Sequence, residues 1–155
     1  MIDRIKALVL GTGGAGDGDA VSTGAADDTQ VAAVALLVEA AVMDGEFDAE
    51  ERRTVARLVS ERFGLAGDEV EDLIAAGEEA VERSHQLFAF TRVIKQGFDF
   101  DDRIRMIEML WEVAYADGEL HDYEASLVRR VAGLIHVADR ESGQARKRVL
   151  ERLGL

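Results

Sequence analysis

Apolar residues recur every three or four positions from Val31 to the end of the chain, which is the periodicity of helices that pack on a shared core. No stretch alternates between apolar and polar residues as a half-buried strand would. The pattern predicts helices over residues 31–43, 48–63, 68–81, 84–97, 101–116 and 121–136, and a last helix that ends near Leu153. The predicted fold class is therefore all-α.

Particular residues are expected to mark the helix ends and the core. The expected caps and stops are Asp28 or Thr29, Gly64, Asp68 with Glu71 as a capping box, and Ser84. The helix over residues 84–97 presents Leu87, Phe88, Val93 and Ile94 as its apolar positions. The next helix is expected to turn Trp111 inward.

The chain before Val31 differs from the rest. Residues 1–10 are apolar at helical spacing and predict a short amphipathic helix that docks on the core. Arg4 and Lys6 are its only cations, so membrane contact through this segment is expected to be weak and peripheral at most. Residues 11–30, rich in Gly and Asp, predict a flexible linker, and residues 31–155 predict the helical domain. We expect a cytoplasmic protein, because no segment is apolar enough for export or a membrane span.

Two stretches of the helical part resemble each other. Residues 41–51 read AVMDGEFDAEE, and residues 114–124 read AYADGELHDYE. Both place Asp-Gly-Glu, an apolar residue and a later Glu between two helices, and the likeness continues in the flanking helices. This repetition predicts an internal duplication of a helix–Asp-Gly turn–helix hairpin within a closed bundle.

Helix capping explains part of this motif. Asp48 is expected to cap the second helix of the first hairpin, and Glu51 to complete a capping box. Capping does not require Glu46, and His121 occupies the place of Asp48 in the second hairpin. Under this interpretation the protein is a metal-free helical interaction scaffold whose acidic motifs are only caps.

The repeated carboxylates also suit a hard divalent cation such as Ca²⁺, Mg²⁺ or Mn²⁺. The candidate ligands are Asp44, Glu46 and Glu51 in the first motif and Asp117, Glu119 and Glu124 in the second, with His121 as a further candidate. An EF-hand is not expected, because its first ligand positions would fall on Ala40 and Val42 in the first motif.

Composition and charge exclude several kinds of function. The 155 residues include no cysteine and no proline, and the formal net charge is −13. Thiol chemistry and thiolate metal sites are excluded, and general nucleic-acid binding is not expected. No Ser–His–acid arrangement is recognisable, so an enzyme is not expected. Acidic residues dominate residues 39–82 and basic ones residues 125–155, which suits either solvated helix faces or faces that dock protein partners.

At the two acidic motifs, over roughly residues 31–142, the sequence resembles the TerB family of tellurite-resistance-associated helical domains, which are related to the N-terminal domain of DjlA co-chaperones. The resemblance implies a bundle of about seven helices with an internal repeat, and a divalent-metal site built from the motif acids. Asp44 and Glu51 match the first motif, and Asp117 and Glu124 the second. Without a J-domain, no co-chaperone activity follows. We therefore expect a stress-associated TerB-like module that binds a divalent cation and acts through unidentified protein partners.

Overall fold

The computed structural model describes residues 18–42, 47–84, 86–116, 118 and 120–155, and the side chains from Asp28 onward. The described residues form helices and no strand, as the apolar periodicity predicts. The helices are α2 (Gly18–Ala41), α3 (Ala49–Phe63), α4 (Asp68–Arg83), α5 (Leu87–Gly97), α6 (Phe100–Ala114), α7 (Asp122–Leu134) and α8 (Asp139–Leu153). The all-α expectation is confirmed.

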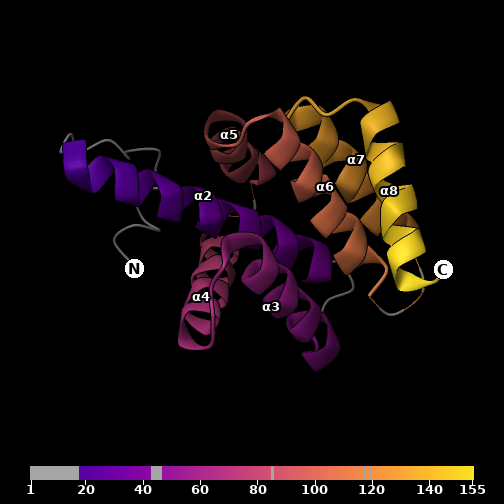
Figure 1. The fold of residues 1–155 in the computed structure, drawn as a ribbon, viewed down its shortest axis with the longest axis horizontal. Coiled ribbons are helices and arrows are strands. Elements are labelled where there is room, and N and C mark those ends of the chain that lie inside the picture. Colours follow the sequence, from indigo (N-terminus) through magenta and orange to yellow (C-terminus); the bar gives the residue numbers. More distant parts are fainter. Residues whose placement is uncertain (1–17, 43–46, 85, 117, 119) are drawn as a thin grey trace.

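Helix α2 is the centre of the bundle. Every residue from Val31 to Val38 is at most 2 % exposed, so the helix is covered on all sides and not along one stripe. A helix that is apolar all round is expected to be buried in this way. Its main neighbours are α4 on one side and α5 on the other, and it also packs on α6 and α3 (Figure 1).

Helix α2 also begins earlier than the sequence predicted. It starts at Gly18 and not near Val31, so residues 18–30, which were expected to be linker, are helical. Asp28 and Thr29 consequently lie inside the helix and do not cap it. One physical reason is that Thr29 is buried against α5, where a Cβ on Gly97 would lie 2.6 Å from the Thr29 Oγ1. Residues 1–17, with the predicted short helix over 1–10, lie outside the described residues.

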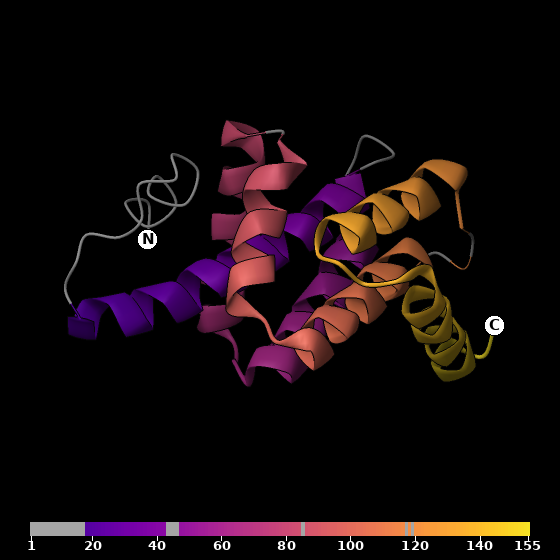
Figure 2. The ribbon, with the colours of Figure 1, turned by 90° about the horizontal axis from the view of Figure 1, so that it is seen from above.

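The two helix pairs α2–α3 and α6–α7 contain the two stretches whose sequences resemble each other. Helices α2 and α6 pack on each other, and their C-terminal ends lie at the same end of the molecule in both views (Figures 1 and 2). Positions that correspond in the two motif-bearing stretches are buried alike in the second helix of each hairpin. These are Val55, Leu58 and Val59 in α3, and Val128, Val131 and Ala132 in α7.

Close packing between α4 and α2 depends on Gly77. A Cβ at this position would lie 2.6 Å from the Val34 Cγ1 and 3.2 Å from the backbone nitrogen of Ala35. Helix α8 packs on α6, where Trp111 is 3 % exposed as expected and its Nε1 donates to the Ser142 carbonyl oxygen at 3.2 Å. These contacts close the bundle around α2 and α6.

The helix ends agree with the sequence in part. Gly64 ends α3 with a φ of 65°, as expected. Helix α4, however, is preceded by Gly67, and Asp68 is its first residue and not its cap. Helix α5 is preceded by Gln86, whose backbone N–H donates to the Ser84 Oγ, so Ser84 lies outside the helix that it was expected to cap.

The described part of the chain contains no helix with both the length and the apolar character that crossing a bilayer requires.

Candidate functional site

The first acidic motif leads into α3 through a capping box. Asp48 is the N-cap residue, and the Glu51 backbone N–H donates to the Asp48 Oδ1 at 2.8 Å. In return, the Glu51 Oε1 accepts from the Asp48 backbone N–H at 3.4 Å. Phe47 packs partly buried on the core beside this turn, with the Arg52 guanidinium 5.5 Å from its ring centroid. The capping interpretation of Asp48 and Glu51 is therefore confirmed.

The second motif leads into α7 in a similar way. His121 is the N-cap residue, and its backbone N–H donates to the Glu124 Oε1 at 3.4 Å. The His121 ring stacks on Tyr123, with ring centroids 5.4 Å apart. Gly118 has a φ of 86°, the left-handed conformation expected of the motif glycine.

Glu51 and Glu124 hold equivalent places, and both are buried. Each is the third residue of its helix, and they are 8 % and 7 % exposed. Burial is unusual for glutamate, which is almost always exposed unless it is paired. The C-terminal ends of α2 and α6, the helices that precede α3 and α7, lie at the same end of the bundle (Figures 1 and 2).

The other predicted ligands cannot be placed in the same way. Asp44, Glu46, Asp117 and Glu119 lie outside the described residues. Within the described part of the chain, no three acidic or histidine side chains form a group that could hold a metal ion. Glu51, Glu124 and the further candidate His121 are thus the predicted ligands that lie among the described residues.

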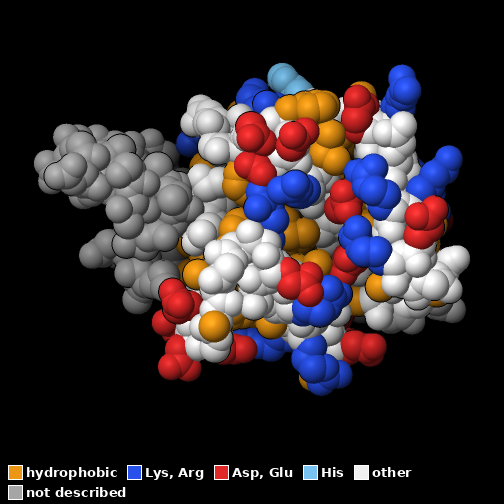
Figure 3. Space-filling model, viewed as in Figure 1, with side chains coloured by type: hydrophobic (Ala, Val, Ile, Leu, Met, Phe, Trp, Pro, Cys, Tyr) orange, Lys and Arg blue, Asp and Glu red, His pale blue; other side chains and the backbone are white. Residues whose placement is uncertain are grey.

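A carboxylate cluster between α3, α6 and α8 escaped the sequence interpretation. Glu112 of α6 is 4 % exposed and accepts from the Arg57 Nη2 of α3 at 2.6 Å and from the Arg152 Nη2 of α8 at 2.8 Å. Arg152 and Arg148 also hold Glu108, one turn earlier in α6. Figure 3 shows acidic and basic side chains alternating over this face.

The ion pairs of this cluster join α3 and α8 to α6. The hydrogen bond to Glu112 raises the pKa of the Arg57 guanidinium above its ordinary value, although burial acts in the opposite direction. A sequence signal existed, because Glu39 and Arg57 recur as Glu112 and Arg130. The pair that forms joins Arg57 of the first hairpin to Glu112 of the second, which repetition alone does not specify.

Aromatic residues beside the second motif are also held in place. Tyr115 is 7 % exposed, and its hydroxyl accepts from the Arg146 Nε at 2.7 Å. The same guanidinium lies 5.5 Å from the ring centroid of Trp111 and 5.8 Å from that of Tyr115. These contacts attach α8 to the end of α6 from which the second motif begins.

Comparison with known proteins agrees with this arrangement. The family model described as tellurite resistance protein TerB matches residues 30–147, which include both acidic motifs and all of α3, α4, α5, α6 and α7. No significant match was found among curated proteins or among solved structures. The helices, the two motif hairpins and the extent of the match lead to one conclusion: the chain belongs to the TerB family.

Proposed function

We propose that this TerB-family module binds a divalent cation, Ca²⁺, Mg²⁺ or Mn²⁺, and acts through protein partners as a binding module and not as an enzyme. The proposed ligands are Asp44, Glu46, Glu51, Asp117, Glu119 and Glu124. The observation that carries the proposal is the burial of Glu51 and Glu124 at equivalent helix starts. Burial of an ionised carboxylate is costly unless a cation or hydrogen bonds compensate it.

The chemistry of the donors fits such an ion. All six proposed ligands are carboxylates, which are the oxygen donors that hard divalent cations prefer. The common end at which α2 and α6 terminate supports a site to which both motifs contribute.

Calorimetric titration with each cation tests this proposal. Glu51→Gln with Glu124→Gln removes both charges, but glutamine still serves in a capping box, so folding is retained. We expect the wild type to bind at millimolar cation or below and the double variant to lose binding, as should Asp44→Ala with Asp117→Ala. At a cation concentration about 100-fold above Kd, wild-type stability should rise by about 2.7 kcal/mol.

The matched control is Glu50→Gln with Asp122→Asn, which removes two exposed carboxylates from the first turns of the same helices. This variant should bind like the wild type. Absence of heat and of any thermal shift at millimolar cation would contradict the metal proposal.

The capping geometry favours a second candidate, a metal-free helical scaffold. The 2.8 Å bond from the Glu51 backbone N–H to Asp48 satisfies a helix end without any ion. In that case a chelator leaves the melting temperature unchanged, whereas Asp48→Ala lowers stability by roughly 1 kcal/mol. A melting temperature that falls on chelation excludes this alternative.

A further inference from the structure

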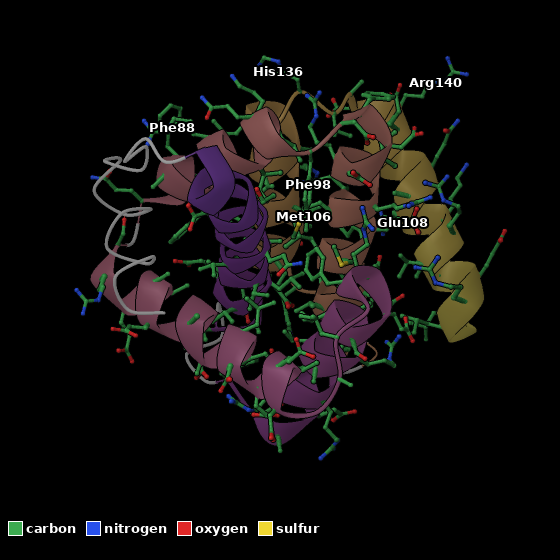
Figure 4. All side chains as sticks on the ribbon, turned by 60° about the vertical axis from the view of Figure 1, so that its left-hand side comes forward. Phe88, Phe98, Met106, Glu108, His136 and Arg140 are labelled. Carbon is green, nitrogen blue, oxygen red and sulfur yellow. The ribbon has the colours of Figure 1, made fainter. Side chains whose placement is uncertain are left out.

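Helix α5 exposes a phenylalanine that the apolar pattern had suggested was part of the core. The buried side of α5 consists of Phe90, Thr91 and Ile94, while Phe88 is 61 % exposed. Figure 4 places Phe88 at the periphery of the molecule, whereas Met106 lies in the interior. A single exposed apolar residue is ordinary, so Phe88 gains meaning only from what surrounds it.

The residues that share the outer side of α5 with Phe88 are cationic. Arg92 and Lys95 follow at spacings that place them on the same side of a helix as Phe88. Both are exposed, and neither forms an ion pair among the described residues. No acidic residue occurs in α5.

The neighbouring helix α7 also exposes cationic side chains. Helices α5 and α7 pack on each other, and α7 exposes Arg129 and Arg130, which also form no ion pair among the described residues. Apart from Asp122 at its first residue, α7 exposes no carboxylate, because Glu124 is buried. We call Phe88, Arg92, Lys95, Arg129 and Arg130 the α5–α7 face.

The rest of the molecule differs from this face only in part, because Arg53 of α3 and Lys147 of α8 are also exposed and form no ion pair among the described residues. The net charge is −13, and arginines of α3 and α8, including Arg57, Arg148 and Arg152, are held by carboxylates. The outer side of α4, just before α5, carries the exposed acids Asp68, Glu69, Glu71, Asp72 and Glu82. The four exposed cations of the α5–α7 face thus lie on two helices that pack on each other in an acidic protein.

We propose that the α5–α7 face binds an acidic segment of a partner protein, with an apolar side chain of that segment covering Phe88. This rests on the part of the proposed function that assigns the module a protein partner, and it gives the chemistry of that partner. Exposed cations that form no ion pair among the described residues are complementary to carboxylates, and covering a phenylalanine side chain is worth about 1.5–3 kcal/mol.

The limited size of the α5–α7 face favours a peptide over an extended anionic surface. Charges are screened over about 8 Å at physiological salt, so the cations act mainly on a segment that lies directly beside them. A membrane or a nucleic acid would extend over Asp99 and Asp101, which are exposed and follow α5 directly. Such contacts would be repelled.

Fluorescence anisotropy with a labelled synthetic peptide tests the proposal. The probe is a helical peptide whose charged positions are all glutamate and whose apolar side carries phenylalanine and leucine. We expect saturable binding in EDTA and in Ca²⁺ alike. Arg92→Glu with Lys95→Glu should weaken binding at least about tenfold, and Phe88→Ala at least about tenfold, as the loss of its burial implies.

Two controls match these variants. Arg53→Glu with Lys147→Glu makes the same change in net charge at exposed positions of α3 and α8, and Leu153→Ala removes an exposed apolar side chain of α8. Each should change Kd by less than about twofold, and circular dichroism verifies that every variant is folded. Two results overturn the proposal: equal weakening by both charge reversals, or no peptide binding while anionic vesicles or a single-stranded oligonucleotide bind.

The peptide titration is independent of the cation titration. Peptide binding in EDTA together with a failed cation titration removes the metal proposal and leaves the α5–α7 face. Cation binding without peptide binding overturns the proposal for the α5–α7 face and leaves the metal proposal standing.

Discussion

Gly77 illustrates, at the scale of one residue, how a missing side chain determines the distance between two helices. Its position in α4 lies against Val34 and the backbone of Ala35 in α2, closer than a Cβ could approach. Alanine is the better helix former by about 1 kcal/mol, so intrinsic propensity and packing act in opposite directions at this position. The 2.6 Å approach to Val34 indicates that packing prevails.

We expect Gly77→Ala to lower the free energy of unfolding by about 1 kcal/mol or more, because overpacking a core costs about 1–3 kcal/mol. Gly143→Ala is the matched control, since α8 has nothing within 4 Å of a Cβ at that position. It should stabilise the protein by about 0.5–1 kcal/mol. Urea unfolding measures both, and equal stabilisation by the two variants would refute the packing argument.

At the scale of elements, the ion pairs explain how α8 is attached to the bundle. Glu112 and Glu108 lie one turn apart on α6, and both form ion pairs with the Arg152 guanidinium. The Glu112 side chain is 5 % exposed and that of Glu108 is 16 % exposed. Hydrogen bonds to a buried charge contribute more to stability than those to a solvated one. Glu112 is therefore expected to contribute more to the free energy of unfolding than Glu108.

Glu112→Gln should therefore lower the free energy of unfolding by about 1–3 kcal/mol. Glu108→Gln, with the same chemistry, helix and arginine partner, should lower it by less than about 1 kcal/mol. Thermal unfolding at low and at high salt compares them, with salt expected to matter more for the Glu108 variant. Equal losses would show that burial does not distinguish the pairs.

The sequence predicts which helices exist better than where they begin. Periodicity located every described helix, because each buries an apolar side such as Val70, Leu73 and Ile74 of α4. The predicted start of α2 was wrong. The contact of Thr29 with α5 cannot be inferred from the local sequence of residues 18–30. The outward direction of Phe88 was also not predicted, because Phe90 occupies the core in its place.

The candidate site was predictable to a similar degree. Repetition identified Glu51 and Glu124, and both are buried at helix starts as the capping box requires. Repetition did not identify the pair of Arg57 and Glu112, because that contact joins the two hairpins across the bundle. Contacts within one turn follow from local spacing, whereas contacts between distant helices depend on the complete packing.

At the scale of the whole molecule, the described helices share one core. Helix α2 packs on α3, α4, α5, α6 and α7, and α8 is joined through α6. Elements that depend on one central helix lose their packing together when that helix is released. A single cooperative transition is therefore expected, as for most domains of this size.

Trp111, the single tryptophan of the chain, lies buried at the contact of α6 with α8. Its fluorescence therefore depends on whether α8 is packed on α6. We expect its fluorescence and the far-ultraviolet circular dichroism to change with the same midpoint on heating. An earlier fluorescence transition would show that α8 detaches as a separate unit.

The all-round burial of α2 has a consequence for the order of synthesis. Among the described residues, this helix precedes all the helices that pack on it, so residues 31–38, all apolar, leave the ribosome before α4, α5 and α6 exist. An uncovered stretch of this kind is what chaperones bind and what aggregates when many copies are made at once. Until α6 has been made, the apolar surface of α2 therefore stays exposed to water unless a chaperone covers it.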